Sequence, residues 1–557
     1  MTCVIPLAYS ALGAFTIVFQ TILLREFFVV AAGNEVSFGI AMAGWLLGVG
    51  AGSLAGAFYA SRRQSTAISF SWTAMALCAA APLLLAAVRS LHAFGAMPQG
   101  MLMPLARSLC LVPLLSLPFC ALSGFAFPLA ARLRPLRAEK TAGAMAGAYA
   151  WESLGAMAGG MLYTFLLAGR FPPVAITIFF ALPLLAASGA VSWAAAAGKR
   201  AAVAALLMLF VSLAALASGA AGRFDSWLAR QRWQGISAAQ LVASLDTRFQ
   251  NLQLGFTRGQ YSLFANGQLA SVFPDDEGNE LLAAQLLSQH PGPRDVLVIG
   301  DAAGGLAKHL LQYPIASLTT VEIDAGVAKM IADHLDASDR RTLGDPRLHT
   351  HIMDGRSFVL LAARGEKNLR RRFDFVFIHQ PDAWTAQINR YYTREFFLDL
   401  QRILTPGGVV ALRLSSAENY ASEIVTPYTA AIYKTLTSVF PAVAISPGMS
   451  NFFFASASVS SVSQDPAVLA RRYAALAPAP ARLAPVFASL YPEEKGAYIL
   501  AALRAAKVPS LNRDDRPIAY FLGSRLLGWS TGSPMSGLFA WFAKFTFISA
   551  LTVLALL

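Results

Sequence analysis

The chain has 557 residues, of which 56% are hydrophobic and only 13% charged, and its mean hydropathy is +0.52. Soluble proteins carry roughly 25% charged residues, so this composition excludes a wholly soluble globular protein. The formal net charge of +13 does not by itself predict nucleic-acid binding, because much of the excess lies in short loops between apolar segments, where membrane orientation explains it.

Apolar segments of about 20 residues, the length that crosses a bilayer, dominate the first 220 positions. Acidic residues are almost absent there and concentrate between 220 and 520. We therefore predict a seven-helix transmembrane domain over 1–219, a soluble domain over 220–525 and a C-terminal transmembrane helix over 536–557. The seven expected spans are 5–31, 38–60, 67–88, 108–131, 143–168, 173–195 and 201–218.

Basic residues in the short loops predict the orientation in the cell membrane. The side with the larger excess carries Arg62, Arg63, Arg132, Arg134, Arg137, Lys140, Lys199 and Arg200, and the other side carries little beyond Arg89, Arg107 and Arg170. This count places the N-terminus in the cytoplasm and, after seven crossings, the soluble domain outside. A cofactor made in the cytoplasm would favour the inside, and the sequence leaves that conflict open.

Ionisable residues within the expected spans are costly and often functional. Arg25 and Glu26 are adjacent in "FQTILLREFF", and we expect them to lie near an interface and neutralise one another. Glu152 stands among Gly147, Gly155, Gly159 and Gly160, a small-residue pattern that favours helix packing over a transport site.

The soluble part begins with short β-rich runs over 251–273, broken by "RG" and "NG", which is typical of a β-hairpin. Strand patterns at 295–299, 318–322, 348–353, 373–378 and 408–414 then alternate with helical patterns. This alternation predicts an α/β Rossmann-like domain with a parallel, doubly wound sheet, in which ligands bind at the carboxyl ends of the strands.

Unusual residues follow three of these expected strands. Gly300, Gly304 and Gly305 end the first strand in "VLVIGDAAGG", where glycine lets a ligand approach the backbone. Glu322 and Asp324 end the second, where a carboxylate can accept hydrogen bonds from ribose hydroxyls. Asp354 follows the third and could accept from an adenine amino group. For each carboxylate, the alternative is a helix N-cap or a solvated loop.

These motifs resemble, in order, those of the membrane-fused bacterial spermidine synthase-like (polyamine aminopropyltransferase) family. The resemblance rests on "RDVLVIGDAAGG", "TTVEIDAGV", "GDPRLHTHIMDGRSF", "YYTREFFLDLQRILTPGGVVAL" and "LNRDDRPIAYF", and on "PFCALSGFAFPLAARL" and "GAYAWESLGAMAGGMLYTFLLAG" in the membrane half. It implies a class I methyltransferase-type fold and transfer of an aminopropyl group from decarboxylated S-adenosylmethionine, or use of S-adenosylmethionine itself, without a metal.

By this resemblance the nucleoside half of the site is retained, and the carried-over cofactor-binding residues are Gly300, Asp301, Gly304, Gly305, Glu322, Asp324, Asp354 and Gly355. The acceptor half departs from the family. Ala303 replaces the aspartate of the glycine-rich turn, and the gate loop reads "HQPDAW", which retains only its second carboxylate. The family's Tyr-His-Glu stretch is here "GNE", at 278–280.

We expect Asp382 and His379 to be the catalytic residues and Gln250, Glu280 and Tyr391 to bind the acceptor. A neutral His379 imidazole could act as general base at near-neutral pH. Alternatively, His379 caps the strand end or stacks on Trp384, and the sequence does not decide between these.

Two functions stay open. The first is a membrane-anchored transferase that acts on a small-molecule amine acceptor, with the lipid bilayer and a second copy of the chain as partners and no nucleic acid. The second is a catalytically inactive nucleoside-sensing or assembly module on a membrane carrier domain. The missing carboxylates favour the second function, and the retained nucleoside half favours the first.

Overall fold

The computed structural model describes residues 4–530, apart from 32, 64, 92–98, 101–102, 134–140, 196–197, 301–303, 367–368, 370–371, 418–421 and 478–480. Asp301 and the predicted span 536–557 lie outside the described residues. The chain divides into two compact units, which we call the helical unit (1–256 with 264–268) and the α/β unit (257–263 with 269–557). The division falls after residue 256 rather than at 219, because buried side chains of α8 (Ala220–Ile236) such as Leu228 and Trp233 belong to the helical unit.

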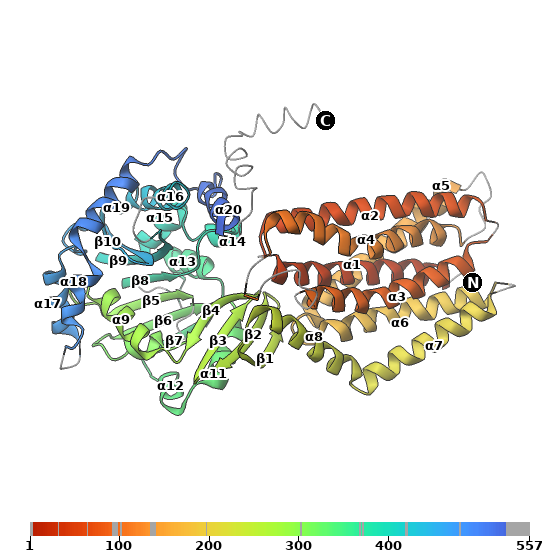
Figure 1. Cartoon of the computed structure of the whole chain (residues 1–557), viewed down its shortest axis with the longest axis horizontal. Coiled ribbons are helices and arrows are strands. Elements are labelled where there is room, and N and C mark those ends of the chain that lie inside the picture. Colours follow the sequence, from red (N-terminus) through yellow and green to blue (C-terminus); the bar gives the residue numbers. More distant parts are fainter. Residues whose placement is uncertain are drawn as a thin grey trace. The chain divides into compact units, whose positions relative to one another are not determined.

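Long apolar helices make up most of the helical unit (Figure 1). They are α1 (Val4–Val30), α2 (Glu35–Ser61), α3 (Ala67–Arg89), α4 (Leu105–Ala131), α5 (Thr141–Leu162) with a π-helical end η3 (Tyr163–Leu167), α6 (Pro173–Trp193) and α7 (Lys199–Ala217). Among the described residues, six of these helices are long and apolar enough to cross a membrane, namely α1, α2, α3, α4, α6 and α7. Helix α5 forms at the fifth expected span, 143–168, but it is not among those six.

Glycines let these helices touch through their backbones. A Cβ atom at Gly52 of α2 would lie 2.1 Å from the carbonyl oxygen of Ala121 in α4, and one at Gly124 would lie 2.1 Å from that of Val49. In α5, a Cβ at Gly155 would lie 2.0 Å from the carbonyl oxygen of Ser10 in α1. The helix-packing interpretation of the glycines around Glu152 is therefore confirmed at Gly155.

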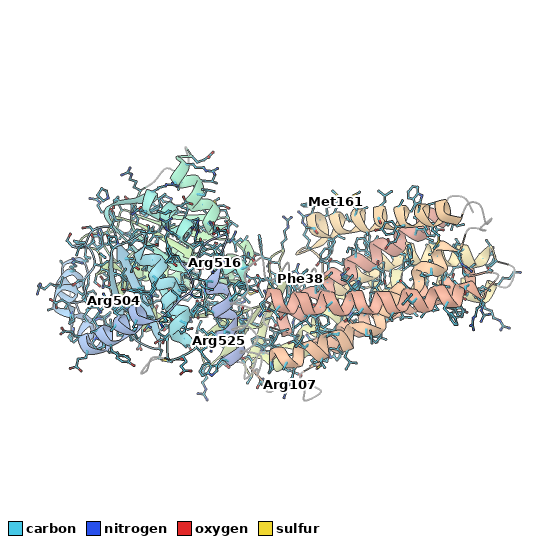
Figure 2. All side chains as sticks on the ribbon, turned by 90° about the horizontal axis from the view of Figure 1, so that it is seen from above. Phe38, Arg107, Met161, Arg504, Arg516 and Arg525 are labelled. Atoms are coloured by element: carbon cyan, nitrogen blue, oxygen red, sulfur yellow. The ribbon has the colours of Figure 1, made fainter. Side chains whose placement is uncertain are left out.

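Large apolar side chains are exposed on the outside of the helical unit. Leu47 and Leu54 of α2 are 74% and 76% exposed, and Phe38 and Met161, labelled in Figure 2, are also exposed. Water would make such a surface a liability. Lipid would cover it without cost, which agrees with membrane association.

The expected pairing of Arg25 with Glu26 is wrong. Glu26 is buried and forms ion pairs with Arg89 and Arg232 instead, whereas Arg25 donates to the backbone carbonyl of Thr247. Successive residues of a helix point about 100° apart and do not face each other. The ion pairs of Glu26 are therefore formed with arginines from other segments.

A four-stranded sheet of order β1-β2-β3-β4 is built from β1 (Gln240–Asp246), β2 (Asn251–Thr257), β3 (Gln260–Ala265) and β4 (Gln268–Phe273). The two turns that flank β3 each combine two residues with positive φ, at 48° and 87° for Arg258-Gly259 and at 48° and 75° for Asn266-Gly267. Such turns match the twist of paired strands, so "RG" and "NG" explain where these strands end.

The α/β unit contains a seven-stranded sheet of order β10-β11-β9-β8-β5-β6-β7. Its parallel part consists of β5 (Asp295–Gly300), β6 (Ser317–Glu322), β7 (Leu348–Ile352), β8 (Phe373–His379) and β9 (Leu404–Ser415). These are the five strands that the sequence predicts, and the Rossmann-like fold is confirmed. Two antiparallel strands, β10 (Ala442–Ser446) and β11 (Ser450–Ser456), are not predicted by the sequence and make the sheet mixed.

Helices cover both faces of this sheet, as Figure 1 shows. In chain order they are α9 (Asp276–Leu287), α10 (Leu306–Leu310), α11 (Ala325–His334), α12 (Ala337–Thr342), α13 (Gly355–Arg364), α14 (Ala386–Asn389), α15 (Arg394–Ile403), α16 (Val425–Thr437), α17 (Pro466–Leu476), η4 (Ala484–Val486), α18 (Phe487–Leu490), α19 (Glu493–Ala505) and α20 (Ile518–Ser530). In α15 the buried residues Phe396, Phe397, Leu400 and Ile403 follow the period of an amphipathic helix.

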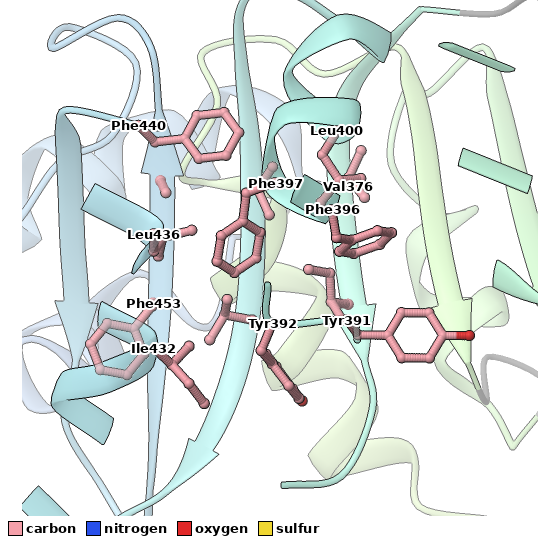
Figure 3. Close-up of a cluster of buried hydrophobic side chains, with 14 of the residues drawn as sticks. Val376, Tyr391, Tyr392, Phe396, Phe397, Leu400, Ile432, Leu436, Phe440 and Phe453 are labelled. Atoms are coloured by element: carbon pink, nitrogen blue, oxygen red, sulfur yellow. The ribbon is translucent and has the colours of Figure 1, made fainter. Parts of the chain in front are cut away.

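One core of the α/β unit lies between the sheet and helices α15 and α16 (Figure 3). Val376 of β8, Phe397 of α15 and Phe453 of β11 are almost completely buried there, and each such side chain contributes roughly 1.5–3 kcal/mol on burial. Tyr391 and Tyr392 belong to the same cluster. The core therefore holds the segment that follows β8 as well as the strands themselves.

Candidate functional site

The candidate site lies where three adjacent strands of the α/β unit end. Gly300 of β5 pairs in register with His379 of β8, and Ile299 pairs with Val321, the residue before Glu322 of β6. The chain runs from β5 outward to β6 and β7 and returns to β8 on the other side of β5. This reversal of strand order is the position where doubly wound sheets bind ligands.

At this edge of the sheet, neighbouring atoms leave no room for a Cβ atom at three of the predicted glycines. Gly300 has φ +118°, and a Cβ there would lie 2.1 Å from the carbonyl oxygen of His379. Gly305 has φ +123°, and its Cβ would lie 2.8 Å from the Nδ2 atom of Asn279. A Cβ at Gly355 would lie 2.4 Å from the Cγ2 atom of Ile299. The predicted glycines thus lie together at the ends of β5 and α13, next to α9.

Glu322 and Asp324 have different environments. Glu322, the last residue of β6, is partly exposed, and its Oε1 atom accepts a hydrogen bond from the Asp324 backbone N at 3.0 Å. Asp324 is buried and caps α11 by accepting from Gly326 N at 2.9 Å. The helix N-cap alternative is therefore confirmed for Asp324, and Glu322 is the carboxylate of this pair that reaches the surface.

Asp354 is also an N-cap, and its two oxygens are both engaged. Its Oδ2 atom accepts from Ser357 N at 2.9 Å and from Ser357 Oγ at 2.8 Å, which caps α13. Its Oδ1 atom accepts from Tyr391 Oη at 3.1 Å and forms an ion pair with Arg390. Burial opposes ionisation, but the Ser357 hydrogen bonds and the Arg390 charge together hold the pKa of Asp354 below its ordinary value.

Arg390 was not predicted as a site residue. It follows α14, its Nε atom donates to the Gln387 carbonyl at 3.0 Å, and its guanidinium carbon lies 5.5 Å from the ring centre of Tyr391. Burial and the neighbouring Asp354 carboxylate raise the pKa of Tyr391 to about 12. Tyr391, expected to bind the acceptor, therefore lies at the predicted adenine carboxylate.

His379 is the last residue of β8 and is partly exposed at the strand end. Its ring stacks on Phe377, with ring centres 5.0 Å apart and an angle of 21° between the planes. Next to it, the Gln380 side chain donates to the Ile299 carbonyl at 3.3 Å and lies beside Gly300. The structure thus places the imidazole at the end of the strand that borders the glycine turn.

Asp382 is only 7% exposed, and its carboxylate is held from within the protein. Its Oδ1 atom accepts from Ser415 N at 3.1 Å and from Tyr428 Oη at 3.0 Å, while its Oδ2 atom accepts from Ser415 Oγ. Both oxygens of this expected catalytic residue are therefore used to hold the loop after β8 against β9 and α16.

Two tyrosines complete this fixation of the loop. Tyr392 Oη donates to the carbonyl oxygens of Gln380 at 3.1 Å and Pro381 at 2.8 Å, and Tyr428 Oη accepts from Ala383 N at 2.8 Å. Burial, with the Asp382 charge, raises the pKa of both hydroxyls well above the ordinary value. They are neutral hydrogen-bonding anchors.

The expected acceptor-binding residues are not all brought together. In α9, Asn279 donates from Nδ2 to Asp275 O at 2.8 Å and approaches Gly304 O at 3.5 Å, so the "GNE" segment does border the glycine turn. Glu280 forms an ion pair of 3.1 Å with the exposed Arg482. Gln250 belongs to the helical unit, where it lines a cavity described below.

Among the described residues, no cluster of three or more His, Cys, Asp or Glu side chains could hold a metal ion. The acidic residues at the strand ends instead receive protein donors, as shown above for Asp324 and Asp354. The chemistry of this edge is therefore that of hydrogen-bond acceptors, an imidazole and an arginine.

Comparison with known proteins gives a family match to this unit. Residues 277–465 match the spermine/spermidine synthase domain. A polyamine aminopropyltransferase of Nitrosomonas europaea is 35% identical over 128 residues, which cover 23% of this chain and 37% of that protein. The chain thus spans little more than a third of the length of this relative.

A second relative matches over a longer stretch. A polyamine aminopropyltransferase of Mycobacterium tuberculosis is 27% identical over 420 residues, covering 73% of this chain and 76% of that protein. A match of this length extends beyond the α/β unit into the helical unit. Among solved structures, spermidine synthase from Thermotoga maritima is 20% identical, with a TM-score of 0.34 and coverage of 41% of this chain and 77% of that chain.

Proposed function

We propose that the chain is a membrane-anchored aminopropyltransferase-like enzyme, because residues 277–465 match the spermine/spermidine synthase domain. It would bind decarboxylated S-adenosylmethionine, or a related adenosyl thioether, and transfer the aminopropyl group to an amine acceptor. The observation that carries the proposal is the alignment of Gly300, Glu322 and His379 at the ends of β5, β6 and β8. The proposed ribose acceptor Glu322 and the proposed base His379 thus end the strands on either side of β5.

The donor, when bound, supplies a sulfonium that is already a good leaving group. The acceptor nitrogen forms a C–N bond as the C–S bond breaks, the thioether leaves, and the nitrogen loses one proton. Protein residues then mainly position the two reactants. In this chain His379 would accept the proton, Glu322 would hold the ribose, and Asp382 would fix the loop that carries His379 rather than meet the amine.

The acceptor would differ from a plain diamine. A diamine dication needs anionic groups at both ends, and in this chain Glu280 is paired with Arg482, Asp382 is buried and Ala303 takes the place of an aspartate. Asn279 at the glycine turn is a neutral hydrogen-bonding group. We therefore propose an acceptor with a single charged amine or with further uncharged polar groups.

A turnover assay on the full chain in detergent tests the proposal. Decarboxylated S-adenosylmethionine would be incubated with a panel of mono-, di- and polyamines, and methylthioadenosine release would be measured by mass spectrometry. We expect release with at least one amine and a loss of about 100-fold in kcat for His379→Ala. An unchanged kcat in that variant would remove the histidine from the reaction, and no release with any amine would contradict transfer.

A second function is favoured by one observation: Asp354, expected to meet the adenine, and Asp382, expected to be catalytic, both use their oxygens within the protein. We propose as the alternative a nucleoside-sensing module without turnover. Methylthioadenosine would then bind, as measured by calorimetry, in a protein that releases no product with any amine. Binding together with turnover would exclude this alternative.

The side of the membrane is part of the same proposal. Six apolar helices in the part of the chain that the structure describes suggest membrane association, and supply of the adenosyl donor favours a cytoplasmic α/β unit. Because α8 begins at Ala220, a topology reporter is best fused after Ser218, where it leaves α7 complete. A periplasmic signal there would make cytoplasmic donor chemistry untenable.

A further inference from the structure

A cavity with several charged side chains in its lining lies within the helical unit. It is bordered by the last turns of α1, by η3, by the start of α6, by α8 and by the turn between β1 and β2. Its polar lining includes Arg25, Glu26, Tyr163, Arg232, Asp246 and Gln250. The proposed transferase site does not include this cavity.

Buried ion pairs surround the cavity. Arg232 Nη1 lies 2.9 Å from Glu26 Oε2, and Glu26 also pairs with Arg89. Arg89 in turn lies 3.1 Å from Asp225 and 4.0 Å from Asp246. Buried charges of this kind are expensive unless every group has a partner. A buried charged group in this cluster that lacks hydrogen-bond partners is therefore a candidate for ligand binding.

Arg232 is such a group. It is 2% exposed, and its Nε and Nη2 atoms find no hydrogen-bond partner within the part of the chain that the structure describes. These two N–H groups share one edge of the guanidinium, the edge that binds two oxygens of a carboxylate or phosphate at once. Glu26 already occupies Nη1. The unused edge thus has the geometry of an oxyanion receptor.

Arginines and carboxylates are equally numerous in this cluster. Arg25, Arg89 and Arg232 face Glu26, Asp225 and Asp246, so the fully ionised cluster is neutral.

We propose that this cavity binds a ligand bearing a carboxylate or a phosphate, which accepts hydrogen bonds from Nε and Nη2 of Arg232. The oxyanion would come from an anionic lipid headgroup or from a soluble metabolite. Cavity residues Ile22 and Phe28 of α1 and Ile176 of α6 supply an apolar wall for the rest of the ligand.

Native mass spectrometry of the full chain in detergent tests this with three probes: phosphatidylglycerol, inorganic phosphate and succinate. We expect saturable binding of at least one probe, and the probe that binds separates lipid from soluble sources. Arg232→Lys keeps a cation for Glu26 but removes the two-donor edge, so the apparent Kd should rise about tenfold or more.

Two further variants make the result decisive. Ala168→Leu fills the cavity without touching an ion pair and should weaken binding to a similar degree. This variant tests the proposal even if Arg232→Lys does not fold. Arg230→Lys, the same change at an exposed position of α8, should leave the Kd within about twofold. Binding that is absent with all probes, or that Ala168→Leu leaves unchanged, would overturn the proposal.

Discussion

Arg390 and Asp354 form an ion pair on the carboxylate that also caps α13 and receives the Tyr391 hydroxyl. Asp354 is the residue that the sequence resemblance assigns to the adenine amino group. A base that binds there must therefore replace Arg390 or share the carboxylate with it. The motif alone does not reveal that this ion pair occupies the carboxylate of the predicted nucleoside site.

We predict that Arg390→Ala strengthens the binding of methylthioadenosine. The pair is partly exposed, with side-chain exposures of 32% and 19%, so breaking it costs only about 0.2–1 kcal/mol. A ligand that no longer has to break the pair should bind up to about fivefold more tightly. Calorimetry on the full chain measures the change. Arg402→Ala, which breaks the exposed pair with Asp399, is the matched control. Weaker binding in Arg390→Ala would mean that this arginine holds the ligand.

We predict that Asp382→Asn destabilises the protein more than it slows the chemistry. The carboxylate accepts three hydrogen bonds in a buried position, and an amide can match only part of them, so unfolding should become easier by about 1–3 kcal/mol. Thermal unfolding and kcat are measured on the same preparation, with Ser415→Ala as a milder comparison. A loss of kcat above about 100-fold with unchanged Tm would restore Asp382 as a catalytic group.

The fold was predictable because its signals are local. Runs such as "VLVIG" and "FVFI" are buried parallel strands whose hydrophobicity is continuous, and all five strands were placed within a few residues. Strands β10 and β11 were missed because "AVAIS" and "SNFFFAS" follow the long helix pattern of α16 and carry no strong turn signal beyond "PG". Their antiparallel pairing depends on the edge that β9 offers.

The site was less predictable, because its chemistry depends on contacts between distant segments. Asp354 and Asp382 stand at the expected strand ends, but their partners Arg390, Ser415 and Tyr428 lie up to 46 positions away. The same holds for Glu26, whose true partners are 63 and 206 positions away. The sequence signal for Arg390 is limited to its position directly before "YY".

Close glycine packing in the helical unit gives a further prediction. Gly52→Ala would place a methyl 2.1 Å from the Ala121 carbonyl oxygen, which forces α2 and α4 apart and should lower the Tm in detergent by several degrees. Gly50→Ala, on the same helix with nothing within 4 Å of its Cβ, is the control and should leave the Tm unchanged. Equal Tm values for the two variants would show that α2 does not approach α4 in this way.

Acid stability of the α/β unit should depend on Asp374. Burial opposes its charge, but hydrogen bonds from Asp295 N at 3.0 Å, Thr405 Oγ1 at 2.7 Å and Arg294 N at 2.9 Å lower its pKa in the folded state. A lowered pKa contributes stability above the unfolded value of about 3.9, and this is lost as pH falls through the folded value. Asp374→Asn should therefore reduce the Tm at pH 7 and much less at pH 3.

The same substitution at exposed Asp333 provides the reference for Asp374→Asn. It should change the Tm little at either pH, because its exposed pair with Lys329 contributes at most a few tenths of a kcal/mol. A Tm difference between wild type and Asp374→Asn that stays constant from pH 7 to pH 3 would show that the ionised carboxylate is not the stabilising form.

Calorimetric titration of the full chain with methylthioadenosine, in wild type and in Glu322→Ala, tests the central claim that the strand ends of β5 and β6 bind a nucleoside. Loss of a carboxylate that accepts from ribose hydroxyls should raise the Kd by about 10- to 100-fold. Glu494→Ala, at an exposed position of α19, should leave it unchanged. An equal Kd in all three proteins, or no binding to wild type, would contradict the account.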